Sequence, residues 1–154
     1  MNREIHGHAR IIKNPKGGPS MKKKLTGKSD LKYLTILGED NKIERVLEVF
    51  PNHHPDRDYT VTLNTKEFTC VCPLTGQPDF AEMKIEYIPD KHILESKSLK
   101  LYLQSFRNEG TFHEHVVNVI LDDIIGALAP RWCKITADFA VRGGIGIAVE
   151  AEYK

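Results

Sequence analysis

Alternating apolar and polar residues predict a β-sheet in the second half of the chain. In "DFAEMKIEYIP" (79–89), apolar residues fall at every second position: Ala81, Met83, Ile85 and Tyr87. This spacing indicates a strand with one solvated face. After Pro130, "RWCKITADFAV" and "IGIAVEAEY" alternate in the same way. The "RGG" between them has two glycines, which allow the positive φ angles of a tight hairpin. Residues 43–50 and 59–65 also have strand composition, and the first of these segments alternatively begins as a helical turn.

Between these strands the apolar spacing changes to three and four residues. "SKSLKLYLQSFRN" and "TFHEHVVNVILDDIIGALAP" both show this helical rhythm, and the second ends at Pro130. The order is therefore strands, two helices, strands. It predicts an α+β domain in which an antiparallel β-sheet carries both helices packed on one face.

The first 28 residues differ from the rest of the chain. They are rich in Lys, Gly and Pro and have few large apolar side chains, so we expect 1–28 to form a flexible basic N-terminal arm. Residues 29–154 are predicted to form a single domain. With 40% hydrophobic and 28% charged residues, the composition is ordinary for a globular protein.

Charge, hydropathy and cysteine content indicate which partners and which cellular location to expect. The net charge of +1 provides no global field for nucleic acid, so we expect no direct nucleic-acid partner. No apolar run approaches the ~18 residues of a membrane span, and no signal-peptide core is visible. Three cysteines without framework spacing indicate reduced thiols in a cytoplasmic protein.

The stretch "FTCVCPLTGQPDF" (68–80) is unusual because it places Cys72 seven residues before Asp79. A thiolate at Cys72 would be a nucleophile, and an acid folded back across the intervening turn would donate a proton to the group attacked. The alternative is a small buried cysteine and a turn aspartate. Cys70 and Cys72 also allow a redox pair or half of a metal site. No second cysteine pair completes four ligands, so no structural metal is predicted.

Two further segments carry candidate binding residues. Lys97 and Lys100 lie three apart near the predicted start of a helix, where they would bind the phosphates of an anionic ligand or form a solvated basic face. In "TFHEH", Thr111 and Glu114 fit a capping box. The Glu114 carboxylate would alternatively accept two parallel hydrogen bonds from a flat N–H edge, such as that of a guanine-like ring.

Taken together, "FTCVCPLTGQPDF", "ESKSLKLY", "QSFRNEGTFHEH" and "VRGG" resemble the NADPH-dependent 7-cyano-7-deazaguanine reductases. These are the nitrile reductases of queuosine biosynthesis, enzymes of the tunnelling-fold superfamily. The resemblance is to their short single-module type and runs from about Glu48 to the C-terminus. The "ESKSLKLY" block is the most specific of the four motifs.

The resemblance implies a role for each matching residue. Cys72 would attack the nitrile carbon and form a covalent thioimide, and Asp79 would protonate the nitrogen. The residues implied in substrate binding are Leu94, Glu95, Ser96, His113 and Glu114. The residues implied in NADPH binding are Ser96, Lys97, Lys100, Arg142 and Gly143.

The resemblance also implies a homo-oligomer. Its subunits would join their sheets into a ring-shaped barrel, with active sites at the subunit junctions and with pentameric rings stacked on one another. Arg142 would then be available to a neighbouring subunit.

Three other functions remain open. A tRNA amidinotransferase of the same superfamily would keep Cys72 and Asp79 but lacks the "ESKSLKLY" block. A zinc-dependent cyclohydrolase of the same fold needs a metal triad that the histidine spacing does not supply. A non-catalytic purine- or pterin-binding ring protein would leave Cys72 and Asp79 inert.

Overall fold

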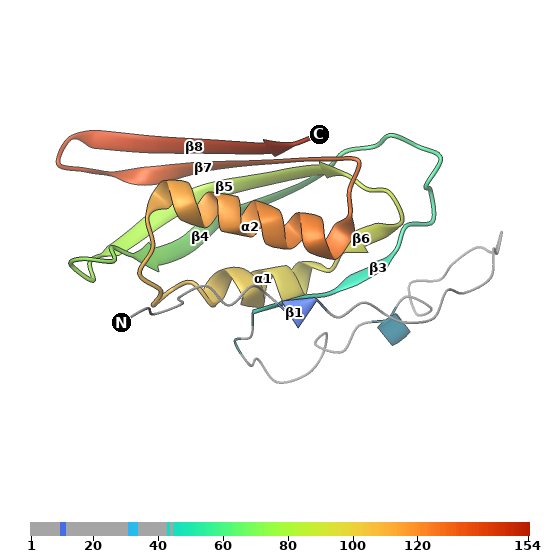
Figure 1. Ribbon diagram of the computed structural model, residues 1–154, viewed down its shortest axis with the longest axis horizontal. Coiled ribbons are helices and arrows are strands. Elements are labelled where there is room, and N and C mark those ends of the chain that lie inside the picture. Colours follow the sequence, from blue (N-terminus) through green and yellow to red (C-terminus); the bar gives the residue numbers. More distant parts are fainter. Residues whose placement is uncertain (1–9, 12–30, 34–42, 44) are drawn as a thin grey trace, which may run out of the picture.

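The computed structural model describes residues 10–11, 31–33, 43 and 45–154 of the chain (Figure 1). The elements are β1 (Arg10–Ile11), the 3₁₀ helix η2 (Leu31–Tyr33), β2 (Val46–Leu47), β3 (Val49–Pro51), β4 (Val61–Val71), β5 (Pro78–Ile88), β6 (His92–Leu94), α1 (Ser96–Gln104), α2 (His113–Leu128), β7 (Trp132–Arg142) and β8 (Ile145–Tyr153). Apart from β1, the predicted N-terminal arm lies outside the described residues.

The main sheet is antiparallel, with strand order β4-β5-β7-β8. The inner strand β5 contains the most regular alternation in the sequence. Its apolar residues Ala81, Met83, Ile85 and Tyr87 are all buried on one face of the sheet. The predicted hairpin is present between β7 and β8. Gly143 and Gly144 adopt φ angles of 59° and 80°, which a side chain would disfavour.

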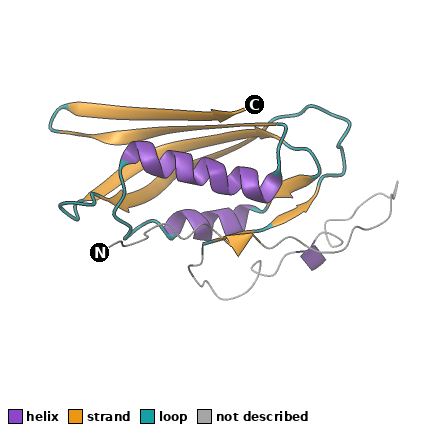
Figure 2. Cartoon of the chain, viewed as in Figure 1, coloured by secondary structure: helices purple, strands orange, loops and turns teal. Residues whose placement is uncertain are grey.

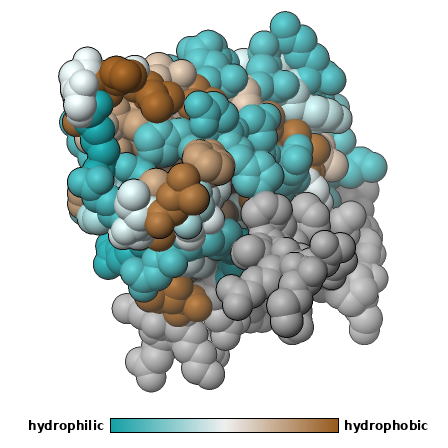
Figure 3. Space-filling model, turned by 60° about the vertical axis from the view of Figure 1, so that its left-hand side comes forward, coloured by the Kyte–Doolittle hydropathy of each residue, from teal (hydrophilic) through white to brown (hydrophobic). Residues whose placement is uncertain are grey.

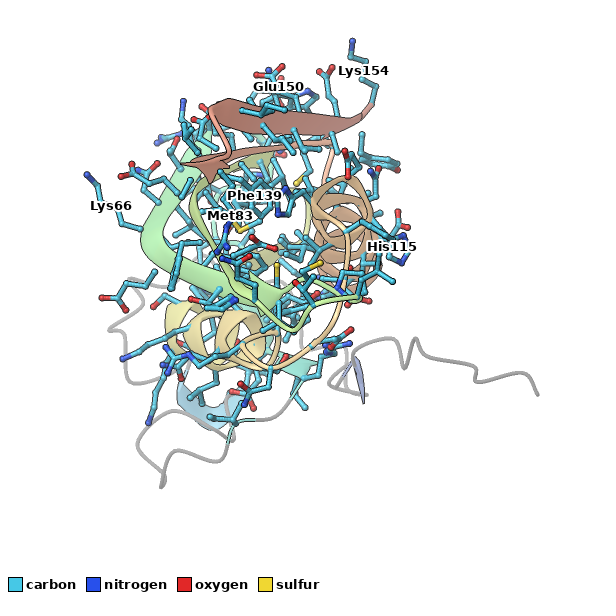
Figure 4. The ribbon with its side chains drawn as sticks, turned by 90° about the vertical axis from the view of Figure 1, so that its left-hand side faces the viewer. Lys66, Met83, His115, Phe139, Glu150 and Lys154 are labelled. Carbon is cyan, nitrogen blue, oxygen red and sulfur yellow. The ribbon has the colours of Figure 1, made fainter. Side chains whose placement is uncertain are left out.

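Both helices cover the same face of this sheet, as the sequence predicted (Figure 2). α2 lies against β7 and β8, and α1 lies against β4. Figure 4 shows Met83 and Phe139 pointing between the sheet and the helices, whereas Lys66 and Glu150 point outward. The helices are also joined by the buried Tyr102 hydroxyl, which donates a 2.7 Å hydrogen bond to Asp123.

Two β-bulges change which residues of the sheet face the helices. In β4, Thr65 pairs with Met83 and Phe68 with Ala81, so Lys66 and Glu67 together oppose Glu82. The extra residue brings Phe68 and Cys70 onto the buried face.

A second bulge lies near the end of β7. Phe139 pairs with Ile147 and Arg142 pairs with Ile145, so Ala140 and Val141 together oppose Gly146. Arg142 therefore shares the face of the buried Phe139, although regular alternation would place these two positions on opposite faces.

Two elements differ in detail from the sequence prediction. Residues 43–50 do not form one strand, because β2 and β3 belong to different small sheets. β2 pairs with β1, and β3 pairs with β6. α1 ends at Gln104, so Phe106 reaches the core from a turn rather than from the helix. None of the helices in the described part of the chain has the length and apolar character needed to span a bilayer.

Candidate active site

Cys72 lies at the start of the turn that joins β4 to β5. Its backbone closes the turn, since its N–H donates to Gln77 at 2.8 Å and its carbonyl accepts from Gly76 at 2.9 Å. Gly76 has a φ of 68°, which the turn requires. The Thr75 hydroxyl, followed by the backbone amides of Thr75 and Leu74, hydrogen-bonds the sulfur and lowers the pKa of Cys72. Because the thiolate is the reactive form, this turn activates Cys72.

The other two cysteines lie in the core. Burial raises the pKa of Cys70 to about 11, with a smaller contribution from the charge of Asp79, and raises the pKa of Cys133 to about 12. All three cysteines are free thiols. Near neutral pH, Cys72 is therefore the one suited to act as a nucleophile.

Asp79 is buried on β5, directly opposite Cys70 in the strand register. One carboxylate oxygen, Oδ2, lies 3.2 Å from His113 Nε2. The other, Oδ1, lies 2.9 Å from Arg142 Nε. The His113 ring is itself stacked on Phe139, with a centroid separation of 3.9 Å and an interplanar angle of 10°. The carboxylate is thus held from both sides by residues of α2 and β7.

The segment between the helices supports the turn that carries Cys72. Val71 donates to the carbonyl of Glu109 and accepts from the N–H of Thr111, both at 3.0 Å. These bonds bring Gly110 against Pro73: a Cβ added at Gly110 would lie 3.1 Å from Pro73 Cα. Gly110 therefore allows the backbone next to Cys72 to approach the start of α2.

Glu114 lies in the first turn of α2, exposed, at the same end of the molecule as Asp79. The capping-box interpretation is wrong, because the N-cap is Phe112 and no side chain caps the helix. Thr111 uses its N–H to bond Val71 instead. Among the described residues the Glu114 carboxylate makes no hydrogen bond or ion pair, so it remains available to a ligand.

The remaining predicted residues surround the start of α1. Leu94 is buried at the end of β6. Glu95 is the N-cap of α1, and its carboxylate accepts from the amides of Lys97 at 2.8 Å and Ser98 at 2.6 Å. Ser96 and Lys100 line a groove of about 270 Å³ between α1 and β4; its other lining residues are Leu63, Asn64, Thr65, Glu67, Phe68, Leu99, Leu103, Gln104 and Arg107.

One chain does not bring all the predicted residues together. Cys72, Asp79, His113, Glu114 and the Arg142–Gly143 hairpin lie at the end of the molecule where the β4–β5 and β7–β8 turns are found (Figure 1). β6 and the start of α1, which carry Leu94, Glu95 and Ser96, lie toward the opposite end (Figure 1).

Several apolar side chains are exposed near the turns of the two hairpins. Leu74, Phe80, Val141 and Ile145 are each more than half exposed, as is Phe112 just before α2. Figure 3 shows apolar side chains on the surface of this side of the molecule. Exposed apolar side chains that lie together are typical of surfaces that bind a partner or a ligand.

Sequence reasoning overlooked three residues that shape the site. Thr75 lies within the quoted turn, but nothing in its spacing indicates that its hydroxyl would reach the Cys72 sulfur. Phe139 belongs to the alternating run after Pro130, and its spacing gives no sign that it would stack on His113. Gly110 had no distinguishing sequence signal. Among the described residues, no group of His, Cys, Asp and Glu side chains is arranged to hold a metal ion.

Comparison with known proteins identifies close relatives. A family model described as "QueF-like protein" matches residues 78–154. A Syntrophus aciditrophicus protein named NADPH-dependent 7-cyano-7-deazaguanine reductase is 70% identical over 131 residues, which cover 85% of this chain and 94% of that protein. A protein of the same name from an Anaeromyxobacter species is 57% identical over 112 residues, 73% of this chain and 92% of that protein.

A solved structure is similar as well. The crystal structure of the archaeosine synthase QueF-Like in the apo form matches with a TM-score of 0.57 and 29% sequence identity. The match covers 60% of this chain and 91% of that chain.

Proposed function

Since this chain belongs to the QueF-like family of NADPH-dependent 7-cyano-7-deazaguanine reductases, we propose that it reduces the nitrile of 7-cyano-7-deazaguanine to a primary amine. The product is 7-aminomethyl-7-deazaguanine, a precursor in the queuosine modification of tRNA. The substrate is the free base rather than tRNA, and the reaction takes place in the cytoplasm. The observation that carries this proposal is the activated Cys72 on the turn that leads directly to the buried Asp79.

The first half of the reaction is addition of the thiolate to the nitrile. The Cys72 sulfur forms a bond to the nitrile carbon, and one C–N electron pair moves to the nitrogen. Asp79 accepts the proton that the Cys72 thiol gives up and passes it to that nitrogen, which leaves a neutral thioimide and an Asp79 carboxylate. The hydrogen bonds from Thr75 favour the thiolate that this step needs. A covalent tether also holds the partly reduced substrate, which water would otherwise hydrolyse.

The deazaguanine ring is held by polar groups beside the nucleophile. Glu114 provides a free carboxylate, which matches two parallel N–H donors on the guanine-like edge of the substrate. His113, already stacked on Phe139, provides a fixed ring next to it. We assign Leu94, Glu95 and Ser96 to the same substrate site through contacts from the start of α1.

The groove beside α1 offers cationic groups for the phosphates of an anionic dinucleotide. It is lined by Ser96 and by two cationic side chains, Lys100 and Arg107, which suit phosphate groups. Ser96, Lys97, Lys100 and the Arg142–Gly143 hairpin would hold NADPH. Two successive NADPH molecules supply the two hydrides that take a nitrile to an amine.

The separation of the two groups of residues supports assembly of several copies. β4 and β8 are the two edges of the main sheet, and unpaired edge strands are available to join neighbouring sheets. The exposed apolar side chains near Cys72 would be covered in such a contact. We assign the chain to a homo-oligomeric ring, stacked as pentamers, in which the start of α1 from one subunit completes the site of its neighbour.

The experiment that tests the function measures NADPH oxidation by the purified protein with 7-cyano-7-deazaguanine, next to a Cys72→Ala variant. We expect two NADPH consumed per nitrile and none with the variant. An adduct on the wild-type protein without NADPH consumption would favour the alternative of an amidinotransferase. Neither turnover nor adduct would refute the proposal.

A further inference from the structure

The Arg142 side chain contacts the proposed proton donor of its own chain. Its Nε lies 2.9 Å from Asp79 Oδ1, whereas the family resemblance assigns Arg142 to the cofactor. The contact depends on the bulge in β7, which turns Arg142 onto the face of Phe139 and toward β5. A regular strand would direct Val141 to this face instead.

Arg142 and His113 divide the carboxylate between them. His113 Nε2 lies 3.2 Å from Oδ2, so each oxygen of Asp79 has its own nitrogen partner. The Asp79 side chain is buried, while one third of the Arg142 side chain is exposed. Removing Arg142 would therefore leave Asp79 Oδ1 without this hydrogen-bond donor in a site with little access for water. Of the two contacts that orient the carboxyl group, only the one with His113 would remain.

Building on the proposed function, we propose that Arg142 positions Asp79 for protonation of the nitrile nitrogen, in the half-reaction that precedes any use of NADPH. In that step the sulfur–carbon bond forms, one C–N electron pair moves to nitrogen, and the Asp79 proton follows it. Asp79 becomes a carboxylate, and the neighbouring guanidinium stabilises the charge that appears. Arg142 acts through Asp79 and needs no contact with the substrate.

This role is compatible with a cofactor contact. A guanidinium has five N–H donors, and Asp79 uses the one on Nε. Among the described residues, no acceptor bonds the terminal nitrogens of Arg142, and they remain able to bind a phosphate. Arg142 thus holds the proton donor Asp79 with Nε, while its terminal nitrogens remain available to a ligand at the exposed edge of the site.

The test follows thioimide formation without NADPH. Protein and 7-cyano-7-deazaguanine are mixed and quenched at intervals, and the adduct is measured by intact-protein mass spectrometry. General acid catalysis contributes roughly 10²- to 10⁴-fold, so we expect Arg142→Ala to slow adduct formation about 10- to 100-fold. Arg142→Lys keeps the charge but not the planar N–H geometry, and it should recover only part of the rate.

Lys134→Ala is the matched control, because Lys134 is a cation on the same strand that pairs with Glu150 on the surface. We expect it to form adduct at the wild-type rate. If Arg142 acts through Asp79, its removal should change the adduct rate less than about twofold in an Asp79→Asn background. This non-additivity separates positioning from a general loss of structure, and thermal unfolding of each variant checks that it folds.

A wild-type adduct rate in Arg142→Ala would overturn the inference and leave the proposed function standing. Equal losses from Arg142→Ala in the wild-type background and in the Asp79→Asn background would overturn it too. Failure of the wild-type protein itself to form an adduct would instead refute the proposed function, and the role of Arg142 with it.

Discussion

Replacing Gly110 by alanine should disturb Cys72 without touching it. The added Cβ would lie 3.1 Å from Pro73 Cα and 3.5 Å from Pro73 Cβ. Ordinary carbon contacts are about 3.5–4.0 Å, so Pro73 would have to move by roughly 0.4 Å. Gly110 does not have a positive φ, and alanine therefore adds no backbone strain. The effect is steric and falls on the residue directly after the nucleophile.

The size of the effect follows from that displacement. Overpacking costs about 1–3 kcal/mol, and the lower entropy of the unfolded alanine chain offsets about 0.4–1 kcal/mol. The net loss of up to about 2.6 kcal/mol corresponds to a fall in Tm of up to about 10 °C. If a 1 Å misplacement of a reacting group costs about 100-fold, a shift of about 0.4 Å should slow adduct formation about sixfold.

The assays are thermal unfolding at fixed protein concentration and NADPH-free adduct formation. Gly146→Ala is the matched control, because its Cβ would meet only Val141 Cγ2 within 4 Å, at an ordinary 3.5 Å. It should keep the wild-type rate. An unchanged adduct rate in a folded Gly110→Ala protein would refute the idea that the close approach of Gly110 and Pro73 positions Cys72.

Three other substitutions test separate parts of the structure. Thr75→Val removes the hydroxyl that is the largest cause of the lowered pKa of Cys72, so the pH midpoint of Cys72 alkylation by iodoacetamide should move upward; an unmoved midpoint would contradict this. Tyr102→Phe takes a donor from the buried Asp123 carboxylate, which should destabilise the fold by about 1–3 kcal/mol in a urea titration. Its failure to do so would mean that Asp123 is satisfied without Tyr102. Glu95→Ala removes the cap of α1 and should lower stability by about 0.5–2 kcal/mol in thermal unfolding. Unchanged stability with weaker substrate binding would assign Glu95 to the substrate alone.

The sheet and the helices could be predicted because burial repeats along them. The alternation in β5 and the double glycine after Arg142 are local signals, and both predictions are confirmed. The end of α1 was harder to predict from the sequence, because Phe106 keeps the helical spacing and is buried although the helix has already ended at Gln104. A buried position can be reached from a turn as well as from a helix.

The candidate site was predicted in part. The Cys72–Asp79 turn was visible because its residues are close together in the sequence. The contacts of Asp79 with His113 and Arg142 were not, because they join elements distant in the chain. The T-x-x-E spacing at Thr111 was misleading, since the Thr111 N–H bonds Val71 and the N-cap falls one residue later. A hydrogen bond to a distant strand, rather than the local T-x-x-E spacing, determined the role of Thr111 at the start of α2.

The two bulges have a consequence for how the length of these strands can change. Side chains alternate between the two faces of a sheet. An inserted or deleted residue therefore normally moves every side chain that follows it in the strand to the opposite face. In β4 the extra residue is already present at Lys66–Glu67, between the first half of the strand and Cys72. Loss of either residue would convert the bulge into a regular strand and leave Phe68 facing the helices. In β7 the same holds at Ala140–Val141, ahead of Arg142. A one-residue deletion in these strands is therefore tolerated best at the bulges, where the chain can shorten by one residue while the reactive groups keep their side of the sheet.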